Sequence, residues 1–372
     1  MNSVPTIESF QPSPLPRLYP TQAQQQQTRM TTKRADGTVL GSATTAEPSP
    51  SDTSESNRLV TGTITVVAKD THYAVVSKPP SVVCHYSEWT GKTSPGKKKK
   101  KKSTSMANTD NTKEDDDDDV EIPVLQRVRE ALQRPINLVH RLDRGASGCL
   151  LCTYLGDGES TAVMQNLMQR EPTEGADDDV DKNDGTKTRK TYVALVRGSG
   201  VLKDRDMKQE GWFMVDRAIK DEKGQEKEAR TWFRFVAGQE GDKRAALVLA
   251  RPVTGRWHQI RRHLNGLSHP ILGDSTHGNS RTNREWRGER GLPGARLCLH
   301  LLELKLPADP TYCPDGVHAL CPLPDDMMRL LREHMPDVLR EARQTLQDEE
   351  GLSLETPLSD PIVLDYAVPV SS

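Results

Sequence analysis

The residues with the clearest capacity for chemistry lie at positions 140–148, which read H-R-L-D-R-G-A-S-G. We expect residues 138–142 to form a strand, whose two-residue period would place Arg141 and Asp143 side by side on one face. The glycine-containing turn that follows would present the aspartate carboxylate to solvent, where it can act without a metal or a general base. On these residues alone, an ordinary turn aspartate paired with an arginine is the better explanation.

Histidines and cysteines were the other groups that could suggest chemistry. His140, His258 and His263 are not spaced as in the usual zinc patterns. Cys149 and Cys152 form a single C-x-x-C inside an apolar run, where a strand would point them to opposite faces. The sequence therefore predicts no metal site. A hydrolase or nuclease that combines the aspartate with these histidines stays a rival hypothesis, and it would depend on a divalent metal.

The elements that must position this aspartate follow from the apolar pattern. Runs rich in β-branched residues, bounded by turn residues, predict strands at 62–67 and 73–77. Further strands are expected at 138–142, 149–154, 191–196, 211–218, 229–236, 245–250 and 296–304, and helices at 122–133, 159–168, 257–267 and 325–347. Many short strands with few helices indicate an α+β fold.

The composition divides the chain into parts. Residues 1–58 are rich in Pro, Ser, Thr and Gln, which predicts a disordered extension before a folded domain at 59–349. Blocks of like charge predict disordered insertions at about 91–119 and 171–187. The lysine run in the first insertion could equally be an import signal, an RNA-binding arm or a solvated linker. Residues 350–372 are expected to form a C-terminal tail.

The chain lacks the sequence features of a membrane or secreted protein. No apolar run approaches the roughly 20 residues of a membrane-spanning helix, and the N-terminus has no apolar signal core. The six cysteines are expected to be buried or free thiols. We therefore expect an intracellular protein. The compartment stays open between nucleus or cytoplasm and mitochondrion or plastid. The basic N-terminus fits a transit peptide as well as plain disorder.

Charge is strongly segregated along the chain. Residues 251–300 contain nine arginines against three acidic residues, whereas residues 171–185 contain seven acidic residues against one lysine. Dense arginine is typical of a protein that binds a phosphate backbone, although a solvated surface of mixed charge would also show it. The sequence thus favours a nucleic-acid partner for the region around 251–300.

Four ordered stretches resemble signature motifs of the RluA-type pseudouridine synthases. Residues 140–150 are similar to H-R-L-D-x-x-T-S-G-L-L, residues 190–194 to K-x-Y-x-A, residues 254–264 to T-G-R-x-H-Q-I-R-x-H-L and residues 269–274 to H-P-I-L-G-D. Ala146 replaces the usual threonine and Cys149 the usual leucine, and neither change removes a catalytic group. The continuation S-T-H-G at residues 275–278, with Arg281 and residues 283–284 following, looks more like the branch of tRNA pseudouridine synthase C than like the ribosomal-RNA branches.

The resemblance implies a pseudouridine synthase fold, with a mixed, mostly antiparallel central sheet flanked by helices and a catalytic cleft along the sheet. It implies an isomerase that breaks the C1′–N1 bond of a uridine and joins C5 to the ribose, without a cofactor. Asp143 matches the catalytic aspartate, Arg261 its arginine partner, and Tyr192 the tyrosine that packs against the flipped uracil. In the family this aspartate either attacks the substrate or abstracts a ribose proton, and the sequence does not choose between these routes.

The resemblance also implies how RNA is held. The target uridine must leave its stack, and Arg141 matches the arginine that fills the gap. Arg256 and Arg262 would contact the RNA backbone, together with the arginines between 281 and 290. His258 and Gln259 share their motif and are further candidates for substrate binding. No obligatory protein partner is implied, and the expected partner is RNA, by preference tRNA, with ribosomal RNA or a catalytically incidental RNA-binding or tRNA-folding module as alternatives.

Overall fold

A computed structural model of the protein describes residues 59–86, 121–156, 159–169, 188–241, 244–357 and 359–369. All of them belong to one compact unit, Ser56–Ser372. The extension predicted at residues 1–58 and the insertions predicted at about 91–119 and 171–187 lie outside the described residues.

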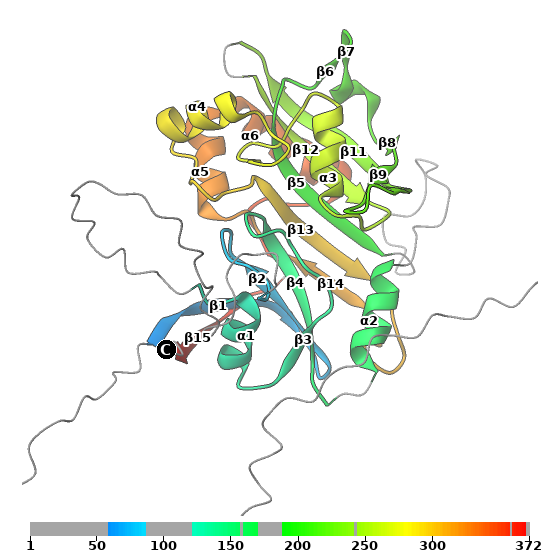
Figure 1. Cartoon of the computed structure of the whole chain (residues 1–372), viewed down its shortest axis with the longest axis vertical. Coiled ribbons are helices and arrows are strands. Elements are labelled where there is room, and N and C mark those ends of the chain that lie inside the picture. The colour runs from blue at the N-terminus through cyan, green and yellow to red at the C-terminus, as the bar shows by residue number, and fades with distance from the viewer. Residues whose placement is uncertain are drawn as a thin grey trace, which may run out of the picture. The chain divides into compact units, whose positions relative to one another are not determined.

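One large sheet runs through the described part of the chain (Figure 1). Its strands are β1 (Leu59–Lys69), β2 (Tyr73–Lys78), β3 (Ile136–Leu138), β4 (Ser147–Tyr154), β5 (Arg189–Arg197), β8 (Phe213–Asp216), β11 (Arg230–Gln239), β12 (Ala245–Pro252), β13 (Leu299–Leu306), β14 (Val317–Leu320) and β15 (Ile362–Pro369). Their order is β15-β1-β2-β4-β13-β5-β12-β11-β8, with β3 beside β4 and β14 beside β13. Only the pairing of β13 with β4 is parallel. The predicted α+β class with a mixed, mostly antiparallel sheet is confirmed.

Helices and short ladders complete the described structure. The helices are α1 (Val124–Leu132), α2 (Ser160–Gln169), α3 (Gln259–Gly266), α4 (Ser280–Arg290), α5 (Asp325–His334), α6 (Pro336–Thr345), the 3₁₀ turn η3 (Met207–Glu210) and the π-turn η4 (Leu346–Glu350). Two-stranded ladders join β6 (Val201–Leu202) to β7 (Arg205–Asp206) and β9 (Ile219–Lys220) to β10 (Glu226–Lys227). Helix α1 packs beside β1 and β15, and α2 beside β4.

Different elements cover the two faces of the sheet at β11. On one face Thr231 is hydrogen-bonded to Gln259 and His263 of α3. On the other face Arg234 is bonded to Glu350 in η4, which follows α6. Residues an odd number of positions apart along a strand, such as Thr231 and Arg234, point to opposite sides of the sheet. We call the α3 side the front face and the side of α6 and η4 the back face.

The apolar core consists of two main clusters that meet at the middle of the sheet. One gathers residues of β5, β11 and β12 with the helices α3 to α6, and the other gathers residues of β1, β2, β4 and β14 with α1 and α2. Tyr192 on β5 packs against both clusters. The segment that contains Asp143 also joins them, because Leu142 belongs to the second cluster and Ala146 to the first.

The strand expected at residues 138–142 is wrong, because β3 ends at Leu138. The Leu151 N–H of β4 is bonded to the ring Nε2 of His140 rather than to a main-chain carbonyl, which ends the ladder. Val139 is buried whereas Arg141 is exposed, so these two residues do not share a face as a strand through 138–142 would require.

The structure also differs from the sequence-based outline at the C-terminal end. The helix expected at 325–347 is broken at Pro336, which has no N–H to continue the helix and begins α6 instead. The tail expected at 350–372 contains β15, which pairs along β1 from Val66↔Ile362 to Leu59↔Pro369. Helix α4 was not expected, since its surface is dominated by arginine and its apolar pattern is weak.

Candidate active site

Asp143 lies in a tight turn between β3 and β4. The carbonyl of Asp143 accepts a hydrogen bond from the N–H of Ala146 at 3.0 Å, which closes the turn. Before the turn, the main chain of Leu142 contacts the Cys84 sulfur through both its N–H and its carbonyl, each at 3.4 Å. The aspartate is therefore fixed on both sides while its own side chain remains 30% exposed.

Two fully buried cations hold the carbonyl groups of this turn. Lys78 Nζ donates to the carbonyls of Arg144 at 3.1 Å and Ala146 at 2.7 Å, and Arg296 Nη1 donates to the carbonyl of Gly145 at 3.0 Å. Burial lowers the pKa of Lys78 to about 8. Hydrogen bonds from charged donors are stronger than neutral ones, so the turn is held rigidly.

Gly145 is required by the packing of this turn. A Cβ at this position would lie 2.7 Å from the Ala295 carbonyl oxygen and 2.9 Å from the backbone nitrogen of Leu297. The Leu297 N–H donates to the Gly145 carbonyl at 3.0 Å, so the two segments touch through their backbones. The glycine of the motif thus serves the close approach of two chain segments.

Arg261 joins two carboxylates. Its Nη1 donates to Asp143 Oδ2 at 2.9 Å, while Nε and Nη2 bind Asp274 Oδ2 and Oδ1 at 2.8 and 2.7 Å. Asp274 also accepts from the backbone N–H groups of Thr276 and His277, both at 2.9 Å. The guanidinium is oriented by this bidentate pair and presents one remaining edge to Asp143.

Charge balance in this cluster favours the ionised forms. Burial alone would lower the pKa of Arg261, but the bonds to Asp274 and the charge of Asp143 raise it above its ordinary value. Burial would raise the pKa of Asp274, but Arg261 and the His277 N–H hold it below its usual range. Two acids therefore share one side-chain cation.

Two neutral imidazoles lie near the Asp143 carboxylate, and an indole stacks on one of them. His258 Nε2 lies 3.9 Å from Asp143 Oδ1, and His258 Nδ1 lies 3.0 Å from His277 Nε2. Burial, together with the charge of Arg261, lowers the pKa of His258 to about 4 despite the opposing charge of Asp143. The Trp257 ring stacks on His258 with 3.8 Å between centroids, and the Trp257 side chain is itself 56% exposed.

Tyr192 lies near the same carboxylate on the front face of β5. Burial raises the pKa of its hydroxyl well above the usual range, and the charge of Asp143 raises it further. The structure thus brings Asp143, Arg261 and Tyr192 together from positions far apart in the sequence.

The family model for RNA pseudouridylate synthase matches residues 72–266. The chain belongs to this family. tRNA pseudouridine synthase C of Yersinia pestis is 34% identical over 193 residues, which cover 49% of this chain and 68% of that protein. The protein of the same name from Vibrio parahaemolyticus is 33% identical over 194 residues, 49% of this chain and 70% of that protein. The resemblance to RluA-type synthases is confirmed, and the protein is an RNA pseudouridine synthase, an isomerase.

Other relatives are matched over different shares of their length. The Pectobacterium carotovorum tRNA pseudouridine synthase C is 33% identical over 198 residues, and the matched part is 47% of that protein, about half its length. The solved structure of human RNA Pseudouridylate Synthase Domain Containing 4 is 19% identical with a TM-score of 0.46, covering 72% of this chain and 91% of that one.

The remaining candidates of the synthase have different surroundings. Gln259 is buried, and its side chain is bonded to Thr254, Thr231 and the Arg256 N–H, so it ties the loop before α3 to β11. Arg141 is exposed. Its guanidinium forms no hydrogen bond or ion pair within the described ranges. Gln259 therefore stabilises the protein's own structure, whereas the Arg141 guanidinium is available to an external partner.

Arg256 and Arg262 lie at the edge of the site. Arg256 Nε donates to the Glu228 carbonyl at 2.9 Å, and Arg262 Nη1 donates to the Lys220 carbonyl at 2.8 Å. Each guanidinium uses one of its donors to hold the β9–β10 segment and retains others. Their contact with an RNA backbone stays a prediction.

Three features of the site were missed as functional signals in the sequence. Lys78 precedes two prolines at the end of a strand, and Arg296 lies in a loop, so neither has a pattern that predicts a buried cation. Trp257 occupies a variable position of its motif, and only the structure shows that its ring is exposed and stacked on His258, which lies near the carboxylate. An aromatic residue next to Arg256, an arginine predicted to contact the RNA backbone, was the available signal.

The described segments contain no group of three or more His, Cys, Asp or Glu side chains arranged to hold a metal ion. None of their helices is long and apolar enough to cross a membrane.

Proposed function

We propose that this synthase converts a specific uridine of tRNA to pseudouridine, with Asp143 as the catalytic carboxylate. One observation carries the proposal: in a member of the pseudouridylate synthase family, Asp143 Oδ2 accepts a hydrogen bond from Arg261, and Oδ1 accepts none from the residues that the structure describes. The preference for tRNA rests on the similarity to proteins named tRNA pseudouridine synthase C.

The proposed reaction begins at the ribose of the target uridine. Arg261 holds Asp143 Oδ2 and leaves Oδ1 directed toward the substrate, with His258 Nε2 3.9 Å away. Asp143 either attacks the substrate or abstracts a ribose proton, and both routes use the same ionised carboxylate. The C1′–N1 bond breaks, the base turns over, and C5 bonds to C1′, while the bond to Asp143 breaks in the first route or the abstracted proton returns to the ribose in the second. The C5 proton then leaves and N1 is protonated.

Base flipping is the second part of the proposal. A uridine stacked in folded RNA is out of reach of a side chain, and extruding it costs a few kcal/mol. Tyr192 lies close enough to Asp143 to pack against the extruded uracil, and the exposed Arg141 would fill the vacated position. Trp257 offers an exposed ring on which a neighbouring base can stack, an interaction worth about 1–3 kcal/mol per base.

The test compares the wild-type protein with Asp143→Asn on tRNA transcripts labelled with tritium at C5 of uridine. Formation of the C5–C1′ bond releases the tritium into water. We expect release by the wild type, in the presence of EDTA as in its absence, and a loss of at least about 10⁴-fold in the variant. The variant should bind tRNA as tightly as the wild type.

Other outcomes separate the alternatives. Tritium release from ribosomal RNA but not tRNA would reassign the substrate. Activity abolished by EDTA would favour the metal-dependent hydrolase. Equal complementation of cells by wild type and Asp143→Asn would favour an RNA-binding or tRNA-folding module in which catalysis is incidental.

A further inference from the structure

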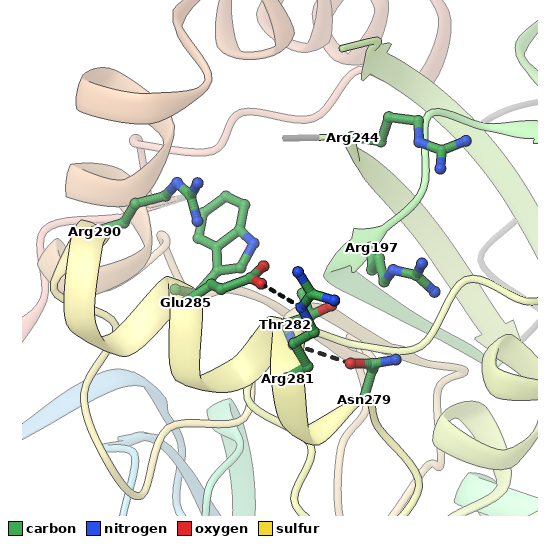
Figure 2. A pocket seen from close by; sticks show the side chains of 8 residues that line it. Arg197, Arg244, Asn279, Arg281, Thr282, Glu285 and Arg290 are labelled. Atoms are coloured by element: carbon green, nitrogen blue, oxygen red, sulfur yellow. Dashed lines mark hydrogen bonds and ion pairs between the residues drawn. The ribbon is translucent and has the colours of Figure 1, made fainter. Parts of the chain in front are cut away.

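An arginine-lined pocket lies at the start of α4, apart from Asp143 (Figure 2). Its volume is about 430 Å³. The lining residues are Arg197, Arg244, Asn279, Arg281, Thr282, Glu285, Trp286 and Arg290. We propose that this pocket binds a backbone phosphate of the RNA substrate. The inference rests on the proposed function and specifies where the RNA is held outside the reaction centre.

The walls of the pocket come from three elements that the backbone ties together. Arg197 ends β5 and its N–H donates to the Pro270 carbonyl at 2.9 Å. Arg244 precedes β12 and its carbonyl accepts from the Gly198 N–H at 3.0 Å. Helix α4 forms the opposite wall, so Arg197 and Arg244 lie across from Asn279 and Arg281 in Figure 2. The spacing of these groups is therefore set by the fold.

The positive charge of the pocket is only partly neutralised. Arg281 is paired with Glu285 at 3.0 Å, and Arg290 with Glu289 at 3.2 Å. Arg197 and Arg244 are exposed, and neither forms a side-chain ion pair with any residue that the structure describes. Two guanidinium groups thus converge without a counterion, and an anion with several acceptor oxygens satisfies both.

Arg290 adds a second, independent feature. Its side chain is 5% exposed and its guanidinium lies 4.7 Å from the centroid of the Trp286 ring. Its Nε is buried without a hydrogen-bond partner. Arg290 lines the pocket at the far end of α4 from Asn279 (Figure 2). A buried cation there raises the attraction for an anion, because the low dielectric around it screens the charge less than water does.

The pocket is connected to the reaction centre through the chain. Asp274, which orients Arg261, and Asn279, which caps α4 by accepting from the Thr282 N–H at 2.9 Å, belong to one short loop. An extended chain of this length spans at most about 18 Å. A few nucleotides of RNA backbone cover that distance, so one strand can reach both the pocket and Asp143.

The experiment removes the two uncompensated charges in the double variant Arg197→Gln/Arg244→Gln. The matched control is Arg205→Gln/Arg340→Gln, which loses the same charge at side chains that are 67% and 78% exposed and lie outside the pocket. Filter binding of a tRNA transcript is measured over a series of salt concentrations. Thermal unfolding of both variants confirms that they are folded.

We expect the pocket variant to bind tRNA about tenfold more weakly at 0.15 M salt, with the slope of log K against log salt reduced by roughly 1, the change for one phosphate contact. KM should rise by a similar factor while kcat at saturating tRNA changes less than about twofold. The control should keep the wild-type slope. An unchanged slope in the pocket variant, or an equal change in the control, overturns the proposal.

Two further measurements, protection by inorganic phosphate and pseudouridine formation, distinguish failure of the pocket proposal from failure of the proposed function. If inorganic phosphate protects the wild type against thermal unfolding but the variant binds tRNA normally, the pocket is a site for free phosphate and the proposal is overturned. Binding needs no turnover, so a reduced slope in a protein that forms no pseudouridine would support the pocket and reject the proposed function.

Discussion

Two clusters of arginine and carboxylate lie on opposite faces of the sheet and have inverse compositions. On the front face one arginine, Arg261, is shared by Asp143 and Asp274. On the back face one carboxylate, Glu350, is shared by Arg234 at 2.6 Å and Arg251 at 2.8 Å.

The inverse composition has a chemical consequence. Glu350 also accepts from the Trp212 indole at 2.8 Å and is 7% exposed, so its acceptor sites are occupied inside the protein. Burial would raise the pKa of Glu350, but the two arginines hold it low. Asp143, by contrast, has one guanidinium contact and an open oxygen. Where two arginines share one carboxylate, as at Glu350, the carboxylate is fully bonded inside the protein. Where two carboxylates share one arginine, as at Arg261, one carboxylate can still bind a substrate.

The largest effect on this comparison is expected from Arg261→Lys. An ammonium keeps the charge but cannot bind Asp274 bidentately and reach Asp143 at once. We expect kcat to fall by roughly 10²-fold through misplacement of the carboxylate. Single-turnover tritium release measures it, with Arg340→Lys as the control. A variant with wild-type kcat would show that Asp143 needs no oriented partner.

The reverse pattern is expected for Glu350→Gln on the back face. Removing this charge leaves Arg234 and Arg251 without their shared counterion and should destabilise the protein by about 3 kcal/mol. Urea unfolding measures the loss, while kcat of the folded enzyme should stay unchanged. The neighbouring Glu349→Gln is the matched control, since Glu349 is 56% exposed and its ion pair should contribute at most about 1 kcal/mol. A loss of kcat in Glu350→Gln would mean that the two clusters are coupled.

A smaller effect, confined to binding, is expected from Trp257→Ala beside the front cluster. Loss of a stacking surface should raise KM for tRNA by roughly 5- to 100-fold with little change in kcat. Trp257→Phe should restore most of the affinity, because it keeps an aromatic face. If phenylalanine and alanine behave alike, the indole serves the packing of His258 rather than the RNA.

The front-face histidine and the back-face carboxylate should affect the pH dependence of stability in different pH ranges. Burial lowers the pKa of both His140 and His258 to about 4, below the value of about 6.5 in an unfolded chain. Between these values the unfolded state binds protons that the folded state does not, so stability should decrease as pH falls from 6.5 toward 4. Glu350, whose pKa is lowered, loses its contribution only below about pH 4.5. Urea midpoints at pH 7.5 and 5 test this, and His258→Gln should flatten the decrease.

The sequence was a good guide wherever the relevant information is local. Alternation and β-branched runs predicted most strands of the sheet, including β1, β2 and β4. The four motifs identified Asp143, Arg261 and Tyr192 as one group. Local patterns failed where a contact outside the local pattern decides the structure. The strand predicted at 138–142 stops early, because the His140 ring accepts a hydrogen bond from the Leu151 N–H and β3 ends.

What the sequence determined by itself is the family of this protein and the identity of the groups that converge in its site. The tertiary structure alone decided how these groups share charge: that Asp274 occupies two edges of Arg261, that Lys78 and Arg296 clamp the turn, and that the presumed tail supplies Glu350 and β15. Each of these contacts joins segments that no helical or strand period relates. Their energy comes from ion pairs and hydrogen bonds between distant segments, which a linear pattern does not record.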